Sequence, residues 1–127
     1  MKMVVDTNVL IRYLVRDHEN HYQQAVKWFK QAMAGSIDLE IKALVVAEAV
    51  FVLQSFYKQK RDPIAESFEV LLSQRWLLVE NRDVLLAAFN WYRQGLHFVD
   101  SYLIACAQKD NCDVLTFDQQ LKSKLRT

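Results

Sequence analysis

Apolar residues recur along the chain with two periods, and each period predicts a different kind of element. Alternating apolar and polar residues at 36–42 predict a half-buried strand. Short apolar runs at 3–5, 76–79 and 114–117 have the length of strands, and we expect the first to be buried. Helical spacing predicts the remaining elements, at about 7–15, 21–34, 43–57, 62–73, 83–94, 100–109 and 118–125.

The predicted helices are bounded by residues that favour helix ends. Asn20 is a candidate N-cap, and Asp62 followed by Pro63 indicates an N-cap with proline at the first helical position. Gly35 and Gly95 follow helical segments where a C-terminal glycine is favoured. Because strands that alternate with helices imply a parallel sheet with both faces covered, the pattern predicts one α/β domain over residues 1–127.

Composition limits the class of protein. Of the 127 residues, 52% are hydrophobic and 24% are charged, which is typical of a globular chain, and the formal net charge of +1 argues neither for nor against a nucleic-acid partner. Cys106 and Cys112 are too few for a disulfide framework and lack a zinc spacing, so we expect reduced thiols in or near the core. The absence of a signal peptide or membrane-spanning run predicts a cytoplasmic protein.

Carboxylates occur at places where an acid is unusual. Asp6 and Asp118 directly follow predicted strands, Glu48 interrupts the most apolar segment of the chain, and Asp100 begins a predicted helix. An acid in apolar surroundings needs a partner, because desolvating its charge costs several kcal/mol. Since the carboxyl ends of parallel strands meet at one sheet edge, we expect these acids to converge there.

A cluster of carboxylates repels itself, and a divalent cation removes the repulsion. Oxygen ligands without a His or Cys set favour Mg²⁺ or Mn²⁺ over zinc, and such ions activate water and stabilise charge on a phosphoryl group. Taken singly, Asp6, Asp100 and Asp118 are equally well explained as turn or capping residues, whereas Glu48 is harder to explain that way. The neighbouring polar residues Thr7, Asn8 and Thr116 are candidates for hydrogen bonds to the acids or for capping.

Other residues that could take part in catalysis or binding have two interpretations each. His97 is a candidate general base, although a single histidine before a helix is more often structural. Aromatic residues fit core spacing better than base stacking: Phe51, Phe56, Trp76, Trp91 and Phe98. Basic residues of a turn and of the C-terminal segment are either phosphate contacts or solvated side chains: Lys58, Lys60, Arg61, Lys122, Lys124 and Arg126.

Segments 4–10, 44–53, 98–105 and 115–118 together resemble a PIN-domain ribonuclease, and within that family the VapC-type toxins of toxin–antitoxin pairs. The resemblance implies a three-layer α/β/α fold with a mostly parallel sheet, and hydrolysis of RNA phosphodiester bonds with Mg²⁺ or Mn²⁺. It makes Asp6, Glu48, Asp100 and Asp118 the metal-binding and catalytic acids, with Asn8 and Thr116 as supporting residues.

The resemblance also implies partners: an RNA substrate, a second copy in a homodimer, and a small antitoxin whose tail covers the active site. One departure from the family pattern is visible, since Asn111 stands where relatives usually have a glycine before the last strand. Asparagine tolerates the left-handed conformation, so we expect the turn to be kept.

Two other classes of function share parts of this pattern. A PIN-like module that binds RNA or protein without cutting is the main alternative, although the intact set of acids argues against it. A phosphoacceptor receiver domain requires an acidic pair after its first strand, and here Asp6 is followed by Thr7 and Asn8, so that class is disfavoured.

Overall fold

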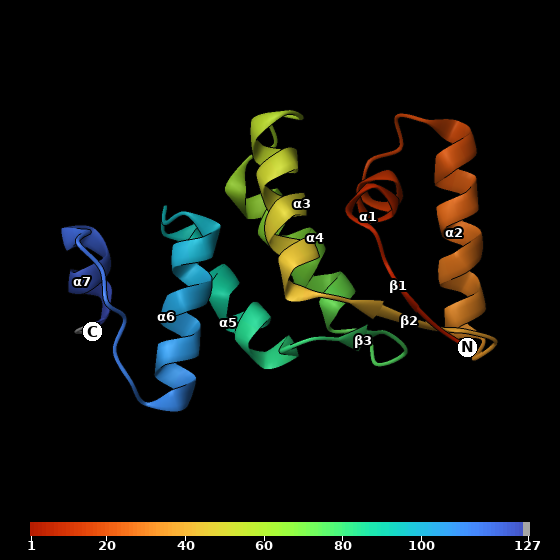
Figure 1. Ribbon diagram of the computed structural model, residues 1–127. Coiled ribbons are helices and arrows are strands. Elements are labelled where there is room, and N and C mark those ends of the chain that lie inside the picture. The colour runs from red at the N-terminus through yellow and green to blue at the C-terminus, as the bar shows by residue number, and fades with distance from the viewer. Residues whose placement is uncertain (126–127) are drawn as a thin grey trace. The chain divides into compact units, whose positions relative to one another are not determined.

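A computed structural model describes residues 1–125. Its strands are β1 (Lys2–Val4), β2 (Asp38–Ile41) and β3 (Leu78–Val79). Its helices, in chain order (Figure 1), are α1 (Thr7–Leu14), α2 (Glu19–Met33), α3 (Ala43–Ser55), α4 (Arg61–Leu72), α5 (Arg82–Arg93), α6 (Phe98–Asp110) and α7 (Gln119–Leu125). The chain forms two compact units, Met1–Glu80 and a second that begins at Asn81.

The first unit contains a parallel sheet in the order β1-β2-β3. Met3 pairs with Leu39, and Ile41 pairs with Val79, so each pair shares one face of the sheet. Leu39 and Ile41 are buried while Asp38 is exposed, which confirms the half-buried strand expected from the alternation at 36–42. Parallel strands joined by helices are the arrangement that an alternating α/β pattern predicts.

Two predictions about strands were wrong. The strand Lys2–Val4 is exposed rather than buried, because β1 pairs with β2 along one edge and burial begins at Val5, just after the strand. Residues 114–117 form no strand: they run as irregular chain, and both Leu115 and Phe117 are fully exposed. An apolar run has strand propensity, but a strand also needs a partner whose hydrogen bonds it can complete.

Helices of the first unit pack around an aromatic centre. α1 packs against α2 and α3, and α3 packs against α4. Phe29 of α2 is fully buried, with its ring 4.0 Å from that of Tyr13 and 6.0 Å edge-on to Trp76. Residues from α1, α2 and the segment before β3 therefore share this part of the core.

Two predicted helix starts lie elsewhere in the structure. α2 begins at Glu19, because the Nδ1 of His18 accepts a hydrogen bond from the backbone N–H of His21 at 3.2 Å and caps the helix in place of Asn20. α4 begins at Arg61, so Pro63 is its third residue rather than its first. The first turn of a helix makes no use of its N–H groups within the helix, so proline is tolerated there.

The second unit has its own apolar packing. Helices α5 and α6 pack against each other, and the rings of Phe89, Tyr92 and Phe98 lie within 6.1 Å of one another. Leu121 of α7 packs with Leu96 and Ile104 in a second small cluster.

Helix ends follow the sequence signals more closely than helix starts. Gly35 and Gly95 have φ values of +83° and +104°, as expected of residues that terminate helices. Asn111 has φ 53° and ψ 51°, and the N–H of Cys112 donates to the carbonyl of Ala107 at 2.9 Å, so the predicted left-handed turn after α6 is confirmed.

These elements confirm a helix-rich α/β fold with a parallel sheet. The prediction of a single domain over 1–127 stays a prediction. Within residues 1–125, no helix has the length and apolar character needed to cross a membrane.

Candidate nuclease site

Asp6 is the residue at which β1 gives way to α1. It is the N-cap of α1, and its Oδ1 accepts a hydrogen bond from the backbone N–H of Asn8 at 3.1 Å. The capping role is therefore real. The side chain is exposed, and its second oxygen has no hydrogen-bond partner among the described residues, so capping leaves one ligand oxygen available.

Glu48 lies in the second turn of α3 and faces solvent, although most of this helix is apolar. The start of α3 is fixed from β3, because the Oε1 of Glu80 accepts a hydrogen bond from the backbone N–H of Ala43 at 2.9 Å. The same carboxylate pairs with Lys42 at 3.6 Å. Glu80 was not singled out from the sequence as a residue that positions α3. Its place directly after an apolar run is the same signal that singled out Asp6.

Asp100 lies in the first turn of α6, where the helix dipole favours an acid. It is not the N-cap: that position belongs to His97, whose Nδ1 accepts from the N–H of Val99 at 3.3 Å and whose carbonyl accepts from the hydroxyl of the buried Ser101 at 3.0 Å. His97 thus has the structural role that was favoured for it. Asp100 is half-buried, and its carboxylate has no ion pair or hydrogen bond to another described residue.

Asp118 stands immediately before α7 and caps it. Its Oδ1 accepts from the N–H groups of Gln120 and Leu121 at 2.8 and 3.2 Å, while its own N–H donates to the hydroxyl of Thr116 at 3.0 Å. Thr116 thus bonds to the backbone of Asp118, and its supporting role in the site stays a prediction. Its other carboxylate oxygen has no partner among residues 1–125.

The donor set fits a hard divalent cation, since each acid keeps at least one carboxylate oxygen free of protein hydrogen bonds within the described chain. Asp6 and Glu48 belong to the first unit, and Asp100 and Asp118 to the second. Among the described residues, no three His, Cys, Asp or Glu side chains gather closely enough to hold a metal ion.

Aromatic and cysteine side chains differ from expectation. Phe51 and Phe56 are 60% and 74% exposed, so they are not core residues, whereas Phe98 is buried as expected. Cys106 is partly buried and Cys112 exposed, and both are free thiols. Burial raises the pKa of the Cys106 thiol. Helix α3 is apolar nearly all round, so the sequence alone does not reveal which face is outermost.

Basic residues remain solvated side chains or phosphate contacts. Lys58 and Lys60 are exposed in the turn between α3 and α4, and Lys58 has φ 58°, a left-handed conformation that closes the turn. Lys122 and Lys124 lie in the last turn of α7, where the helix dipole favours cations. Arg126 lies outside the described residues.

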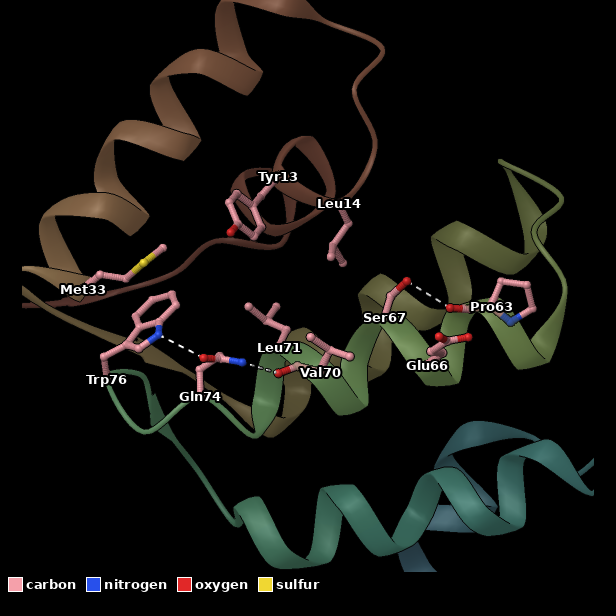
Figure 2. A pocket seen from close by; sticks show the side chains of 10 residues that line it. All are labelled: Tyr13, Leu14, Met33, Pro63, Glu66, Ser67, Val70, Leu71, Gln74 and Trp76. Atoms are coloured by element: carbon pink, nitrogen blue, oxygen red, sulfur yellow. Dashed lines mark hydrogen bonds between the residues drawn. The ribbon is translucent and has the colours of Figure 1, made fainter.

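A groove of about 580 Å³ runs between the α1–α2 pair and α4 in the first unit. Figure 2 shows hydrogen bonds among several of its lining residues: the Trp76 indole N–H donates to Gln74 at 3.2 Å, the Gln74 amide to the carbonyl of Val70, and the Ser67 hydroxyl to the carbonyl of Pro63. What the groove offers a ligand is therefore mainly apolar, including Val70 (61% exposed) and Met33 (50% exposed).

Comparison with known proteins gives a family. Residues 3–124 match the model of the PIN domain, which is nearly the whole chain. The chain therefore belongs to the PIN domain family, whose members are mostly metal-dependent nucleases. No curated protein and no solved structure matched the chain.

Proposed function

We propose that this protein is a metal-dependent endoribonuclease that hydrolyses RNA phosphodiester bonds in the cytoplasm, with Asp6, Glu48, Asp100 and Asp118 as its catalytic acids. The observation that carries the proposal is the PIN-domain match over residues 3–124, a span that includes all four acids. The carboxylates are also able to act as ligands, because Asp6 and Asp118 each keep one oxygen that accepts no hydrogen bond from the described residues.

Bound Mg²⁺ or Mn²⁺ would supply Lewis-acid chemistry at the phosphate. The chain's own contribution is to position the ligands. The N–H of Asn8 donates to one oxygen of Asp6 and so fixes the orientation of the whole carboxylate. Asp118 is held in a similar way by its bonds to Thr116 and to the first turn of α7. Glu80 holds the start of α3, which carries Glu48. Such preorganisation means that little rearrangement is needed when the ion and substrate bind.

The test is cleavage of a labelled single-stranded RNA with Mn²⁺, compared with EDTA. Asp6→Asn and Asp100→Asn each keep the shape of the side chain and remove the charge, so we expect the cleavage rate to fall by roughly a hundredfold or more. Asp38→Asn in β2 and Asp110→Asn at the end of α6 are matched controls, because both are exposed acids outside the set. Full activity in Asp6→Asn and Asp100→Asn would overturn the assignment of these acids, whereas a wild type that binds RNA without cutting it would favour the binding module.

We propose that a small antitoxin protein silences the enzyme, as in the VapC-type toxins that the sequence resembles. The groove beside α4 supports a protein partner, since its exposed Val70 and Met33 suit an apolar helix or strand and its rim carries the acidic Glu66. The test uses the product of a small neighbouring reading frame, co-expressed with the toxin. Val70→Glu should abolish co-purification, whereas Val26→Glu on α2, outside the groove, should not. Co-purification that is unchanged by Val70→Glu would exclude this groove.

We also propose that the protein forms a homodimer. The outer side of α3 supports it, because Leu44 and Phe51 are 80% and 60% exposed and lie two turns apart on the same stripe of the helix, and exposed apolar stripes are typical of interfaces. Light scattering should give twice the monomer mass for the wild type and the monomer mass for Phe51→Glu. A monomeric wild type would contradict the proposal.

A further inference from the structure

A furrow beside Asp6 and Asn8 is not used by the proposed chemistry. It consists of two adjoining hollows of about 170 and 200 Å³ in the first unit. Asp6 lines the first hollow and Asn8 the second, and Val9 and Trp28 line both. The furrow therefore runs from the candidate site along the α1–α2 pair, with Trp28 where the two hollows meet.

The side chains along the furrow are of the types that recognise nucleobases. Trp28 of α2 is 36% exposed, and its indole N–H has no hydrogen-bond partner among the described residues. Gln24, one turn earlier on the same helix, is exposed and likewise makes no hydrogen bond within residues 1–125. His21 and Arg12 complete the second hollow. The surface of the second hollow is almost entirely apolar, which suits the stacking of a base on the Trp28 indole.

Arg12 is held in place at the far end of the furrow. Its guanidinium donates to Asp17 at 3.0 Å, and the hydroxyl of Tyr57 donates to the other oxygen of the same carboxylate at 2.8 Å. The Tyr57 hydroxyl, and then Arg12, lower the pKa of Asp17, so the carboxylate stays charged through the neutral range. One bond to Asp17 leaves most of the guanidinium donors free, and guanidinium groups match phosphate oxygens well.

We infer that this furrow binds the single-stranded RNA next to the scissile phosphate, with one base stacked on Trp28 and a flanking phosphate on Arg12. This inference rests on the proposed nuclease function. The size of the hollows favours RNA over a protein partner, because about 200 Å³ admits one planar ring and not a helix. Its continuity with Asp6 places the bound strand at the candidate site rather than elsewhere on the molecule.

The inference is tested by binding, which does not depend on catalysis. A fluorescein-labelled single-stranded RNA of mixed sequence is titrated with the full-length protein in EDTA, so that no cleavage occurs. Trp28→Ala should weaken binding about 5- to 150-fold, the usual loss for one stacked base. Trp28→Phe should keep most of the affinity, because it keeps a stacking face. Phe56→Ala removes an exposed aromatic outside the furrow and should bind as the wild type does.

Arg12 gives an independent readout. In Arg12→Gln the dependence of binding on salt should become shallower by about 0.7 to 1 in log–log slope, as expected for one lost phosphate contact. Loss of affinity at an unchanged salt slope would mean that Arg12 contacts no phosphate. Circular dichroism of each variant separates loss of binding from loss of fold.

The outcomes separate this inference from the proposed function. If the wild type cleaves RNA and Trp28→Ala binds RNA as well as the wild type does, the furrow is not the RNA-binding site, and the proposed nuclease function stands. If RNA binding depends on Trp28 but the protein does not cleave RNA, the furrow is an RNA-binding site and the proposed nuclease function is wrong. If light scattering shows that Trp28→Ala converts a dimer to a monomer while RNA binding is unchanged, the furrow is a protein interface and the RNA inference is wrong.

Discussion

Glu19, the first residue of α2, has a carboxyl pKa that its neighbours lower strongly. The guanidinium of Arg16 donates to both of its carboxylate oxygens, at 2.7 and 3.0 Å, and Gln23 adds a further bond at 2.9 Å. Arg16 first, and then Gln23, lower the pKa of Glu19 from 4.5 to about 2. The pair is exposed, so salt screens it and its contribution to stability is small.

The sign of the resulting pH dependence follows from the lowered pKa. The contribution of Glu19 to stability is fully present above pH 4.5, which is the ordinary pKa of a glutamate. It is lost as the pH falls through about 2, the pKa of Glu19 in the folded protein. An NMR titration of the Glu19 carboxyl group should therefore show a midpoint well below that of an ordinary glutamate. The difference in unfolding free energy between wild type and Glu19→Gln should shrink over the same range at low salt. A midpoint near 4.5 would show that the Arg16 contact is absent in solution.

At the scale of residues, chemistry could be predicted from the sequence better than geometry. The four acids were proposed because each stands at an element boundary or inside an apolar segment, and their role stays a prediction, whereas the bond between Thr116 and the backbone of Asp118 is present in the structure. The cap of α2 was missed because His18 and Asn20 both accept hydrogen bonds, and only the local backbone decides between them. The furrow at Trp28 was missed because its residues are brought together by α1 and α2 across a loop.

Asn111 tests how an element is terminated. It follows α6 in the left-handed conformation, with φ 53°, and the turn returns the Cys112 N–H to Ala107. Asn111→Ala should destabilise the protein by about 1–2 kcal/mol, because a Cβ without a local hydrogen bond is disfavoured there. Asn111→Gly should be neutral or slightly stabilising. Urea unfolding of both variants checks this, and equal stability of the alanine and glycine variants would contradict the cap.

Phe29 tests the packing of elements in the first unit. Its ring is fully buried between Tyr13 and Trp76. Phe29→Ala should lower the unfolding free energy by about 3–5 kcal/mol, a large part of the ~5–15 kcal/mol that holds a typical domain together. Phe29→Leu keeps most of the volume and should cost much less. Chemical denaturation measures both, and a small loss in the alanine variant would mean that the helices repack without this residue.

Elements with a clear hydrophobic period within the segment were predicted well. An element that requires pairing with a distant segment was not. Helices α1 and α5 and strand β2 lie close to their predicted ranges, since the signal lies within the segment. The run at 114–117 has the composition of a strand but none of the pairing that makes one. The proline signal placed the start of α4 two residues late, because Pro63 is compatible with any position in the first turn.

At the scale of the molecule, the fold class follows from the order of elements, and the PIN-domain match spans both units. The proposed acids are divided between the units, with Asp6 in the first and Asp100 in the second. The sequence pattern shows that both acids stand at element boundaries. It does not show whether both bind the same metal ion. That question has a thermodynamic answer.

A metal that binds the folded protein raises its melting temperature by linkage, so added Mn²⁺ should raise the melting temperature of the wild type over EDTA by several degrees. If the acids act as one set, Asp6→Asn and Asp100→Asn should each remove most of this rise, and the double variant should remove no more than either single one. Asp38→Asn and Asp110→Asn should keep it. Losses that add up in the double variant would mean separate sites, and the proposed joint set would be wrong. A rise that survives in all variants would mean that Mn²⁺ binds elsewhere on the protein.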